Sequence, residues 1–192
     1  MRYTLIGSTP LIFILLTTFA VVAAPTKKSY NVSGLTIEEL ASSLNASGPD
    51  GGWGETKNQW SYETKWVIDG DQLKVSKVSV KIETTITMPS WPGYSAASKC
   101  MKSSWDKMYK SLQNHEQQHM KIAQGVDDKI KNAILALPPQ PSSSTQDDLT
   151  ALSDATMQPI IETNNTAQDK LDSDTDHGKS DPKDPVTLNS CP

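Results

Sequence analysis

The sequence lacks an excess of basic residues, and outside its first 24 residues it lacks any long apolar run. Its 18 Lys and Arg residues are scattered among 22 Asp and Glu residues, which gives a formal net charge of -4. Because such a chain offers no basic surface to phosphates, we expect no nucleic acid among its partners. No segment after residue 24 is apolar enough to span a bilayer, so we expect no stable membrane insertion of the mature chain.

The first 24 residues have the order of a secretory signal peptide. Arg2 precedes a mostly apolar stretch over residues 11–22, and Ala23 and Ala24 come directly before Pro25. This pattern predicts cleavage near Pro25 and export to the periplasm or out of the cell. An uncleaved N-terminal anchor is the alternative, although the apolar stretch is short for a membrane helix.

Cysteine is also scarce, with only Cys100 and Cys191 in the chain. In an oxidising compartment such a pair favours one disulfide, which would hold the end of the chain beside the segment near residue 100. Two free thiols are the alternative. Unless Cys191 is anchored in this way, residues 179–192 should form an extended tail.

The N-terminal half shows three local patterns. Residues 29–33 suit a short strand, and a capping box over residues 36–39 opens a helix. A glycine-rich loop follows over residues 48–54. Trp53 in this loop is either a plug over the core or part of a binding rim, and the plug is the favoured interpretation.

From Trp60 onward the apolar residues recur with a period of two. Residues 60–68 and 78–88 therefore predict an antiparallel hairpin with one buried face, joined by a turn at Asp69 and Gly70. Pro89 ends the second strand. The positions expected to share one face of the first strand are Trp60, Tyr62, Thr64, Trp66 and Ile68.

The C-terminal half is predicted to be helical. Apolar residues recur at steps of three and four over residues 96–137, which predicts one long helix. A linker rich in Pro and Ser leads to a second helical pattern that begins at Asp147 and continues to Leu171, and Pro159 should kink or split it. The expected fold class is α+β, with a small antiparallel sheet or hairpin packed on the long helix and on the C-terminal helix.

The long helix carries the run His-Glu-Gln-Gln-His at residues 115–119. Residues four apart lie on one helical face, so His115 and His119 can bind one cation while Glu116 flanks it. Zinc at a catalytic site takes three protein ligands and leaves a fourth position for water. The pattern therefore indicates a zinc hydrolase in which Glu116 is the general base.

This motif has two simpler explanations. A shuffled chain would contain this motif with a chance of roughly one in a thousand, or about one in a hundred when other recognisable motifs are allowed for, so coincidence is a poor explanation. Two solvated histidines on a helix surface would also produce it. However, His115 and His119 fall on the apolar stripe, where unpaired imidazoles would be costly to bury.

The third ligand is limited by the scarcity of histidine, because the only other histidine is His177. Two familiar spacings for a third ligand fail, since position 125 is Gly125 and Glu162 is the only glutamate after Glu116. Glu162 in the second helix stays a candidate. His177 follows that helix in a loop that could fold back, with neighbouring aspartates to hold its ring. A solvated tail histidine is the remaining alternative.

Further segments are shared with a known family. They are residues 30–40, the loop at 48–56, the Pro-Trp element at 88–91, Trp105 and the Thr-x-His-Gly segment at 175–178. With these, the chain from about residue 30 to residue 178 resembles a family of secreted bacterial proteins described as zinc-dependent proteases and carried as a domain of unknown function. The resemblance implies Zn2+ as cofactor and supports His177 as the third ligand.

The combined expectation is a secreted zinc metallopeptidase with its domain at residues 25–178 and a peptide or protein as substrate. His115, His119 and His177 would hold Zn2+, and Glu116 would be the catalytic base. An extended substrate could pair with an exposed edge of the hairpin.

Two other functions stay open. A zinc amidase acting on cell-wall peptides would use the same residues. A non-catalytic envelope protein would instead use zinc to hold the second helix on the first. Tyr94 and Tyr109 are the candidates for steadying an oxyanion, although core packing is the favoured role for both.

Overall fold

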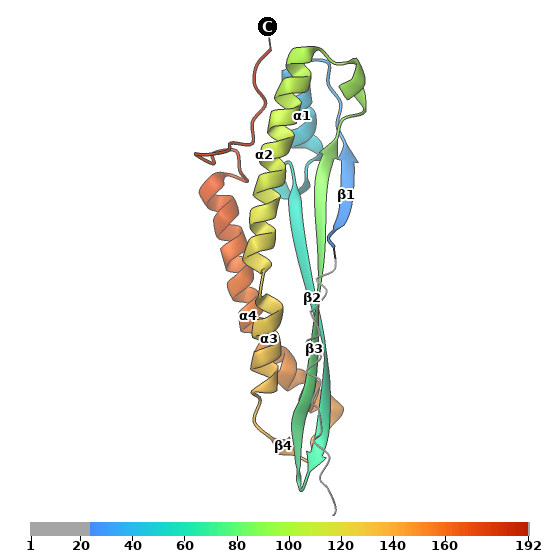
Figure 1. Ribbon diagram of the computed structural model, residues 1–192, viewed down its shortest axis with the longest axis vertical. Coiled ribbons are helices and arrows are strands. Elements are labelled where there is room, and N and C mark those ends of the chain that lie inside the picture. Colours follow the sequence, from blue (N-terminus) through green and yellow to red (C-terminus); the bar gives the residue numbers. More distant parts are fainter. Residues whose placement is uncertain (1–23, 192) are drawn as a thin grey trace, which may run out of the picture.

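The sheet of the protein, seen in the computed structural model, is built around one long hairpin (Figure 1). The structure describes residues 24–191, so the predicted signal peptide lies outside the described residues except for Ala24. Strands β2 (Glu55–Asp69) and β3 (Gln72–Ser90) pair antiparallel along the whole of β2, from Glu55 opposite Thr87 to Asp69 opposite Gln72. Between them Gly70 has a φ of 65°, a left-handed conformation that glycine adopts without strain. The predicted hairpin is confirmed.

Two short strands complete the sheet and make it mixed. Strand β1 (Thr26–Asn31), which begins three residues earlier than predicted, runs parallel to β3. Strand β4 (Gln140–Pro141) pairs antiparallel with the other end of β3. The order β1-β3-β2 leaves β2 at an edge, because within the described residues it pairs only with β3. The α+β class is confirmed, whereas the sheet is not purely antiparallel because β1 joins it in parallel.

Helices cover one face of the hairpin. Val78 is buried on this face, and Trp60, Tyr62 and Val80 are half-buried beside it. The expectation of a buried position is wrong for Ile68, which is 74% exposed. Ile68 lies next to the turn, and the tip of the hairpin extends beyond the helices in Figure 1.

Helix α1 (Ile37–Ser47) begins where the sequence predicts. Its N-cap Thr36 accepts a hydrogen bond from the backbone N–H of Glu39 at 3.2 Å, which satisfies one of the unpaired amides of the first turn. In the loop after α1, Trp53 is buried, and its indole N–H donates to Asn45 Oδ1 at 2.8 Å. The plug interpretation of Trp53 is confirmed.

A glycine divides the long helix predicted for residues 96–137 into two. Helix α2 (Lys99–Ala123) ends just before Gly125, and helix α3 (Val126–Leu135) begins just after it. Gly125 has a φ of 78°, a left-handed conformation that interrupts the helical hydrogen bonds. In α3, Ile130 and Ile134 are fully buried.

Helix α4 (Gln146–Thr175) is continuous and starts one residue before the predicted position. Thr145 and Asp148 form a reciprocal capping box at its start. Pro159 lies inside the helix, and Figure 1 shows that the first and last parts of α4 run in different directions. Pro159 therefore kinks the helix and does not split it.

Apolar side chains form two clusters, called the upper and the lower cluster. Helices α1 and α2, which contribute to the upper cluster, lie toward the top of Figure 1, and helix α3, which contributes to the lower cluster, lies toward the bottom. The upper cluster lies beneath α1 and α2, and its fully buried members include Leu40, Leu44, Met108, Leu112 and Val186. The lower cluster joins the hairpin, α3 and the first part of α4, and its buried members are Val78, Val126, Ile130, Ile134 and Met157. None of the helices among residues 24–191 combines the length and the apolar character needed to cross a bilayer.

Residues 178–191, called the C-terminal strap below, run along α2 (Figure 1). The hydroxyl of Ser104 donates to the carbonyl of Asn189 at 3.0 Å and accepts from its N–H at 2.7 Å. Cys191 forms a disulfide with Cys100 near the start of α2. The predicted disulfide is confirmed. With the buried side chain of Val186 and the hydrogen bonds of Ser104, it holds the end of the chain on α2.

Candidate metal centre

The three residues expected from the His-Glu-Gln-Gln-His run lie on α2 and are buried. His115, Glu116 and His119 are 3%, 2% and 5% exposed. The Nε2 atoms of the two imidazoles, one helical turn apart, are separated by 3.2 Å. Burying two imidazoles and a carboxylate is costly unless each has a charged or hydrogen-bonded partner. Their partners therefore indicate what the site is built to hold.

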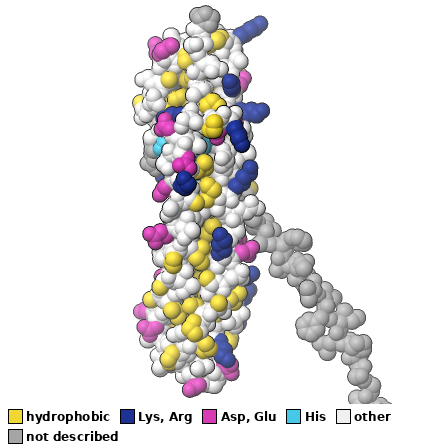
Figure 2. Space-filling view, turned by 90° about the vertical axis from the view of Figure 1, so that its left-hand side faces the viewer, with side chains coloured by type: hydrophobic (Ala, Val, Ile, Leu, Met, Phe, Trp, Pro, Cys, Tyr) yellow, Lys and Arg dark blue, Asp and Glu magenta, His cyan; other side chains and the backbone are white. Residues whose placement is uncertain are grey.

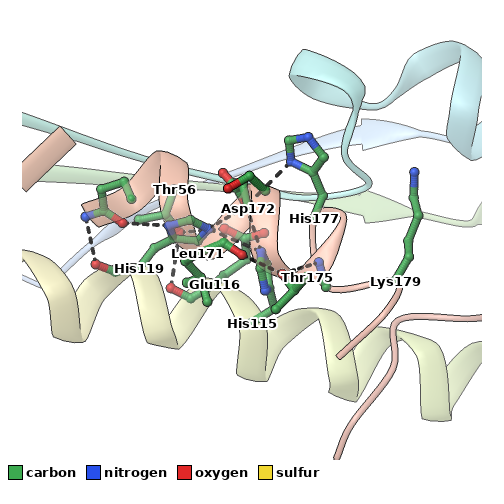
Figure 3. Close-up of polar contacts among 12 residues, drawn as sticks. Thr56, His115, Glu116, His119, Leu171, Asp172, Thr175, His177 and Lys179 are labelled. Atoms are coloured by element: carbon green, nitrogen blue, oxygen red, sulfur yellow. Dashed lines mark hydrogen bonds and ion pairs between the residues drawn. The ribbon is translucent and has the colours of Figure 1, made fainter. Parts of the chain in front are cut away.

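The partner of both imidazoles is Asp172, from the last turns of α4 (Figure 3). Its Oδ1 atom lies 3.0 Å from His115 Nε2 and 3.1 Å from His119 Nε2. The ligand atoms of these three residues all lie within 4.8 Å of one another. Across residues 24–191 this is the single group of His, Cys, Asp and Glu with metal-binding spacing.

His177 contacts the same carboxylate from the edge of the site. Its Nδ1 atom is 3.5 Å from Asp172 Oδ1, and its side chain is 37% exposed. Histidine atoms accordingly reach the surface in the upper part of Figure 2. His177 does not belong to the group of ligand atoms within 4.8 Å of one another, so its assignment as third ligand stays a prediction.

The backbone around His177 is unusual. Asp176, His177 and Gly178 have φ values of 47°, 51° and 82°, so the chain turns through three left-handed residues directly after α4. Two of the three are not glycine, which costs free energy and is typical of functional sites. The N–H of His177 donates to the carbonyl of Asp172 at 2.9 Å, which fixes this turn to the helix end.

Glu116 is oriented by the start of β2. The hydroxyl of Thr56 donates to Glu116 Oε2 at 2.8 Å. Oε1 faces Gly54, where a Cβ atom would come within 2.6 Å of it, so a side chain at position 54 would displace the carboxylate. Burial raises the pKa of Glu116, although the Thr56 hydrogen bond and the two histidines partly oppose this. A raised pKa suits a group that accepts a proton near neutral pH.

The imidazoles and Asp172 form one electrostatic unit. Burial alone would lower the pKa of His119, but hydrogen bonds with Asp172 and Gln168 and the charges of Asp172 and Glu116 raise it. Burial alone would raise the pKa of Asp172, but its contacts with His115 and His119 hold that pKa well below its ordinary value. The group therefore attracts positive charge, which a proton or a metal cation can supply.

This donor set fits a zinc ion in type and spacing. Imidazole nitrogen and carboxylate oxygen are ordinary zinc ligands. Ligand atoms about 2.0–2.1 Å from a tetrahedral zinc lie roughly 3.3–3.4 Å apart. The three separations among His115, His119 and Asp172 are 3.0, 3.1 and 3.2 Å. Little movement is needed for the three residues to bind one ion.

The outer contacts of the two imidazoles differ. His119 Nδ1 is 2.6 Å from Gln168 Oε1, the kind of contact that orients a ligating imidazole. His115 Nδ1 is buried without a hydrogen-bond partner among the described residues. Gly178 packs against the His115 ring, since a Cβ atom there would lie 3.0 Å from Cγ. On the Nδ1 side of the ring, His115 is therefore oriented by packing and not by a hydrogen bond.

The other candidates from the sequence lie away from this site. Glu162 is exposed and precedes Asp172 by ten residues, which is about 15 Å along the helix. Glu162 does not belong to the group of ligand atoms within 4.8 Å of one another, so the structure gives no support to its candidacy as a ligand. Tyr94 and Tyr109 pack against the upper cluster beside the first half of α2, so their packing role is confirmed.

The sequence interpretation missed Asp172 and Gln168. With Asn164 they form a polar series at intervals of four, so the three residues share one face of α4. A polar stripe on a helix in a chain with two buried histidines was the available signal. Whether this stripe contacts the histidines depends on which turn of α4 packs against α2, and the sequence patterns did not predict that packing.

Comparison with known proteins identifies the family. A family model described as "Bacterial protein of unknown function (DUF922)" matches residues 27–178. The matched segment includes His115, Glu116, His119, Asp172 and His177, and it ends where the C-terminal strap begins. No curated protein and no solved structure matches the chain. Because the model matches well over half of the sequence, the chain belongs to the DUF922 family of bacterial proteins, whose function is unknown.

Proposed function

We propose that the protein is a secreted zinc-dependent peptidase with Glu116 as its general base. The observation that carries the proposal is the position of Glu116, buried beside two imidazoles whose Nε2 atoms are 3.2 Å apart. Thr56 holds one carboxylate oxygen of Glu116, Oε2, by a hydrogen bond. Gly54 has no side chain and so leaves room for the other oxygen, Oε1. Secretion is inferred from the order of residues 1–24, which matches a signal peptide.

His115 and His119 would hold the ion, and the third ligand would come from the end of α4 or the turn after it, where Asp172 and His177 lie. Bound there, zinc would supply a Lewis acid and would lower the pKa of a water molecule toward about 7. The protein's own part in the proton transfer falls to Glu116.

The two oxygens of Glu116 have different surroundings. Oε2 accepts the hydrogen bond from Thr56, so we assign the proton transfer from water to Oε1. Because burial raises the pKa of Glu116, the carboxyl can hold this proton until the leaving amine takes it. Gly54 is required here, since any side chain at that position would meet Oε1.

The free edge of β2 supports a peptide as substrate. Thr56 lies on this strand beside Glu116, and within the described residues β2 pairs only with β3. An extended peptide can add to such an edge through backbone hydrogen bonds, which would place a peptide bond near Glu116.

Two other functions use the same residues. A zinc amidase acting on cell-wall peptides would differ only in its substrate. A non-catalytic protein that uses zinc to hold α4 on α2 is favoured by one observation, the presence of Asp172 beside two imidazoles with His177 close by. Four such donors could close a structural site and leave no position for water.

The test compares Glu116→Gln with Glu162→Gln, a control at the exposed glutamate of α4. Both variants of the mature chain should retain zinc. Glu116→Gln should hydrolyse a library of unstructured peptides about 10²- to 10⁴-fold more slowly, because it loses general-base catalysis. Glu162→Gln should stay within about twofold of wild type.

Wild-type turnover by Glu116→Gln would refute the mechanism. If wild type binds zinc but cleaves neither this library nor peptides from the cell wall, the non-catalytic function is correct.

A further inference from the structure

We infer that Asp172 is the third protein ligand of the metal ion, so that the ion joins the last turns of α4 to α2. This inference rests on the zinc site proposed above and specifies how it is completed. It assigns to a residue of α4 the role that was predicted for His177.

The spacing of the donor atoms favours Asp172 over His177. Asp172 Oδ1 and the Nε2 atoms of His115 and His119 form a nearly equilateral triangle with sides of 3.0, 3.1 and 3.2 Å. An ion on the axis of this triangle contacts all three atoms at ordinary zinc distances. His177 approaches only the carboxylate, at 3.5 Å, and lies outside the group that shares this spacing.

Apolar packing does not account for the contact between the end of α4 and α2. Met157, Ile160 and Ile161 belong to or pack against the lower cluster, but among the described residues no later part of α4 joins either cluster. Asn164 is buried, and neither its amide nitrogen nor its amide oxygen has a partner in the described part of the chain. A polar interface of this kind is costly to desolvate, and metal binding can offset that cost.

Gln168 and Asp172 supply the contacts that remain. The Gln168 side chain donates to the carbonyl of His119 at 3.1 Å, and its oxygen lies 2.6 Å from His119 Nδ1. One turn later, Asp172 reaches the Nε2 atoms of both histidines. Gln168 therefore orients the ring whose other nitrogen faces the ion, and Asp172 supplies the ligand from the same face of α4.

The turn after α4 holds Asp172 in place before any ion binds. The carbonyl of Asp172 accepts the N–H of His177, and the N–H of Gly178 donates to the hydroxyl of Thr175 at 3.0 Å. The C-terminal strap closes on this turn, since the N–H of Val186 donates to the carbonyl of Gly178 at 3.0 Å. A ligand fixed in this way loses little conformational freedom on binding. His177 is then an outer partner of the Asp172 carboxylate.

The test is the zinc affinity of the mature chain, measured by competition with a chromophoric chelator. Asp172→Ala should weaken zinc binding more than about 100-fold, because loss of a ligand exceeds the roughly 10- to 100-fold effect of outer contacts. His177→Ala should weaken it by no more than about 10-fold. Asp169→Ala, at an exposed aspartate of the same helix, should stay within about twofold.

Two further measurements exclude misfolding as the cause. Asp172→Asn preserves the shape of the side chain and should also lose affinity, while the circular dichroism of each variant should match wild type. In wild type, removal of zinc should speed amide hydrogen exchange over residues 164–178 and leave α3 unchanged.

The inference is overturned if both Asp172 variants bind zinc like wild type while His177→Ala does not, because His177 is then the third ligand. Unchanged hydrogen exchange over residues 164–178 would also overturn it. If wild type itself binds no zinc, the proposed function fails as well, and this outcome is distinct from the other two.

Discussion

The first part of α4, as far as Ile161, and the second part, from Glu162 to Thr175, contact the protein through different kinds of side chain. The first part presents Met157, Ile160 and Ile161 to the lower cluster. The second part presents Gln168 and Asp172 to the histidines of α2. The direction of the helix changes near Pro159, which lies close to the end of the first part.

This difference shows how one helix can serve both the fold and the site. Apolar contacts in the first part gain free energy from burial without requiring exact partners. Buried polar contacts in the second part are stable only if each donor and acceptor is satisfied, which makes them selective for one arrangement. The first part should therefore determine stability, and the second part should determine metal affinity.

The largest expected effect is a loss of stability when the apolar contacts of the first part are disrupted. Met157→Ala removes most of a buried side chain from the lower cluster and should lower the free energy of unfolding by about 2–5 kcal/mol. Urea unfolding with a chelator present measures this loss. Zinc affinity of the folded variant should stay close to wild type, and a large drop in affinity would show that the two parts of α4 are not independent.

The second effect concerns the C-terminal strap, which forms a hydrogen bond from Val186 to Gly178 in the turn after the second part. Replacing Cys100 and Cys191 together by serine opens a covalent loop and should cost about 2–4 kcal/mol of stability. Urea unfolding of the double variant and of oxidised wild type, both without reductant, measures this loss, and wild type under reducing conditions should match the double variant. Equal stability of the double variant and the oxidised wild type would contradict a supporting role for the strap.

The third effect tests the second part directly. Gln168→Ala leaves His119 Nδ1 without its partner and should weaken zinc binding roughly 10- to 100-fold. The stability of the zinc-free protein should change little, because Gln168 joins neither apolar cluster. Gln158→Ala, at an exposed glutamine of the first part, is the matched control and should leave zinc affinity unchanged. A similar loss in both variants would refute a specific role for Gln168.

The smallest effect is a pH dependence in the C-terminal strap. Hydrogen bonds from Ser111 and Asn114 lower the pKa of Asp184. A lowered pKa in the folded state means that the contribution of Asp184 to stability is present above the unfolded pKa near about 4 and is lost as pH falls below it.

Asp184→Asn should therefore be less stable than wild type at pH 7, by about 0.5–1.5 kcal/mol, the net worth of a hydrogen bond. The difference should shrink toward pH 3 in urea unfolding. A difference that grows on acidification would have the wrong sign and would refute this assignment.

The sequence predicted the parts of the fold that depend on local periodicity. The period of two in Trp60 and Tyr62 and the capping box at Thr36 act within a few residues, so the hairpin and α1 were found. The break at Gly125 was missed because the apolar spacing continues through it, and only the left-handed φ of the folded chain reveals it. The parallel pairing of β1 with β3 was missed because it joins residues far apart in sequence.

The residues of the candidate site also fall into two groups: those predicted from local sequence and those that depend on tertiary packing. His115, Glu116 and His119 were found because the helix repeat alone brings them together. Asp172 was missed because it reaches them from a separate helix, at a turn that only the packing of α4 on α2 determines. His177 was proposed as a ligand because it is the only other histidine, but the number of histidines does not tell how far its ring lies from His115 and His119.

The central claim is that His115 and His119 bind one zinc ion, and anomalous X-ray diffraction from crystals of the mature chain tests it most directly. Data collected just above and just below the zinc absorption edge should give one difference peak per chain, about 2.0–2.1 Å from both Nε2 atoms and beside Asp172 Oδ1. Crystals grown with zinc that show no peak between the two imidazoles, and both rings hydrogen-bonded to Asp172 alone, would contradict it.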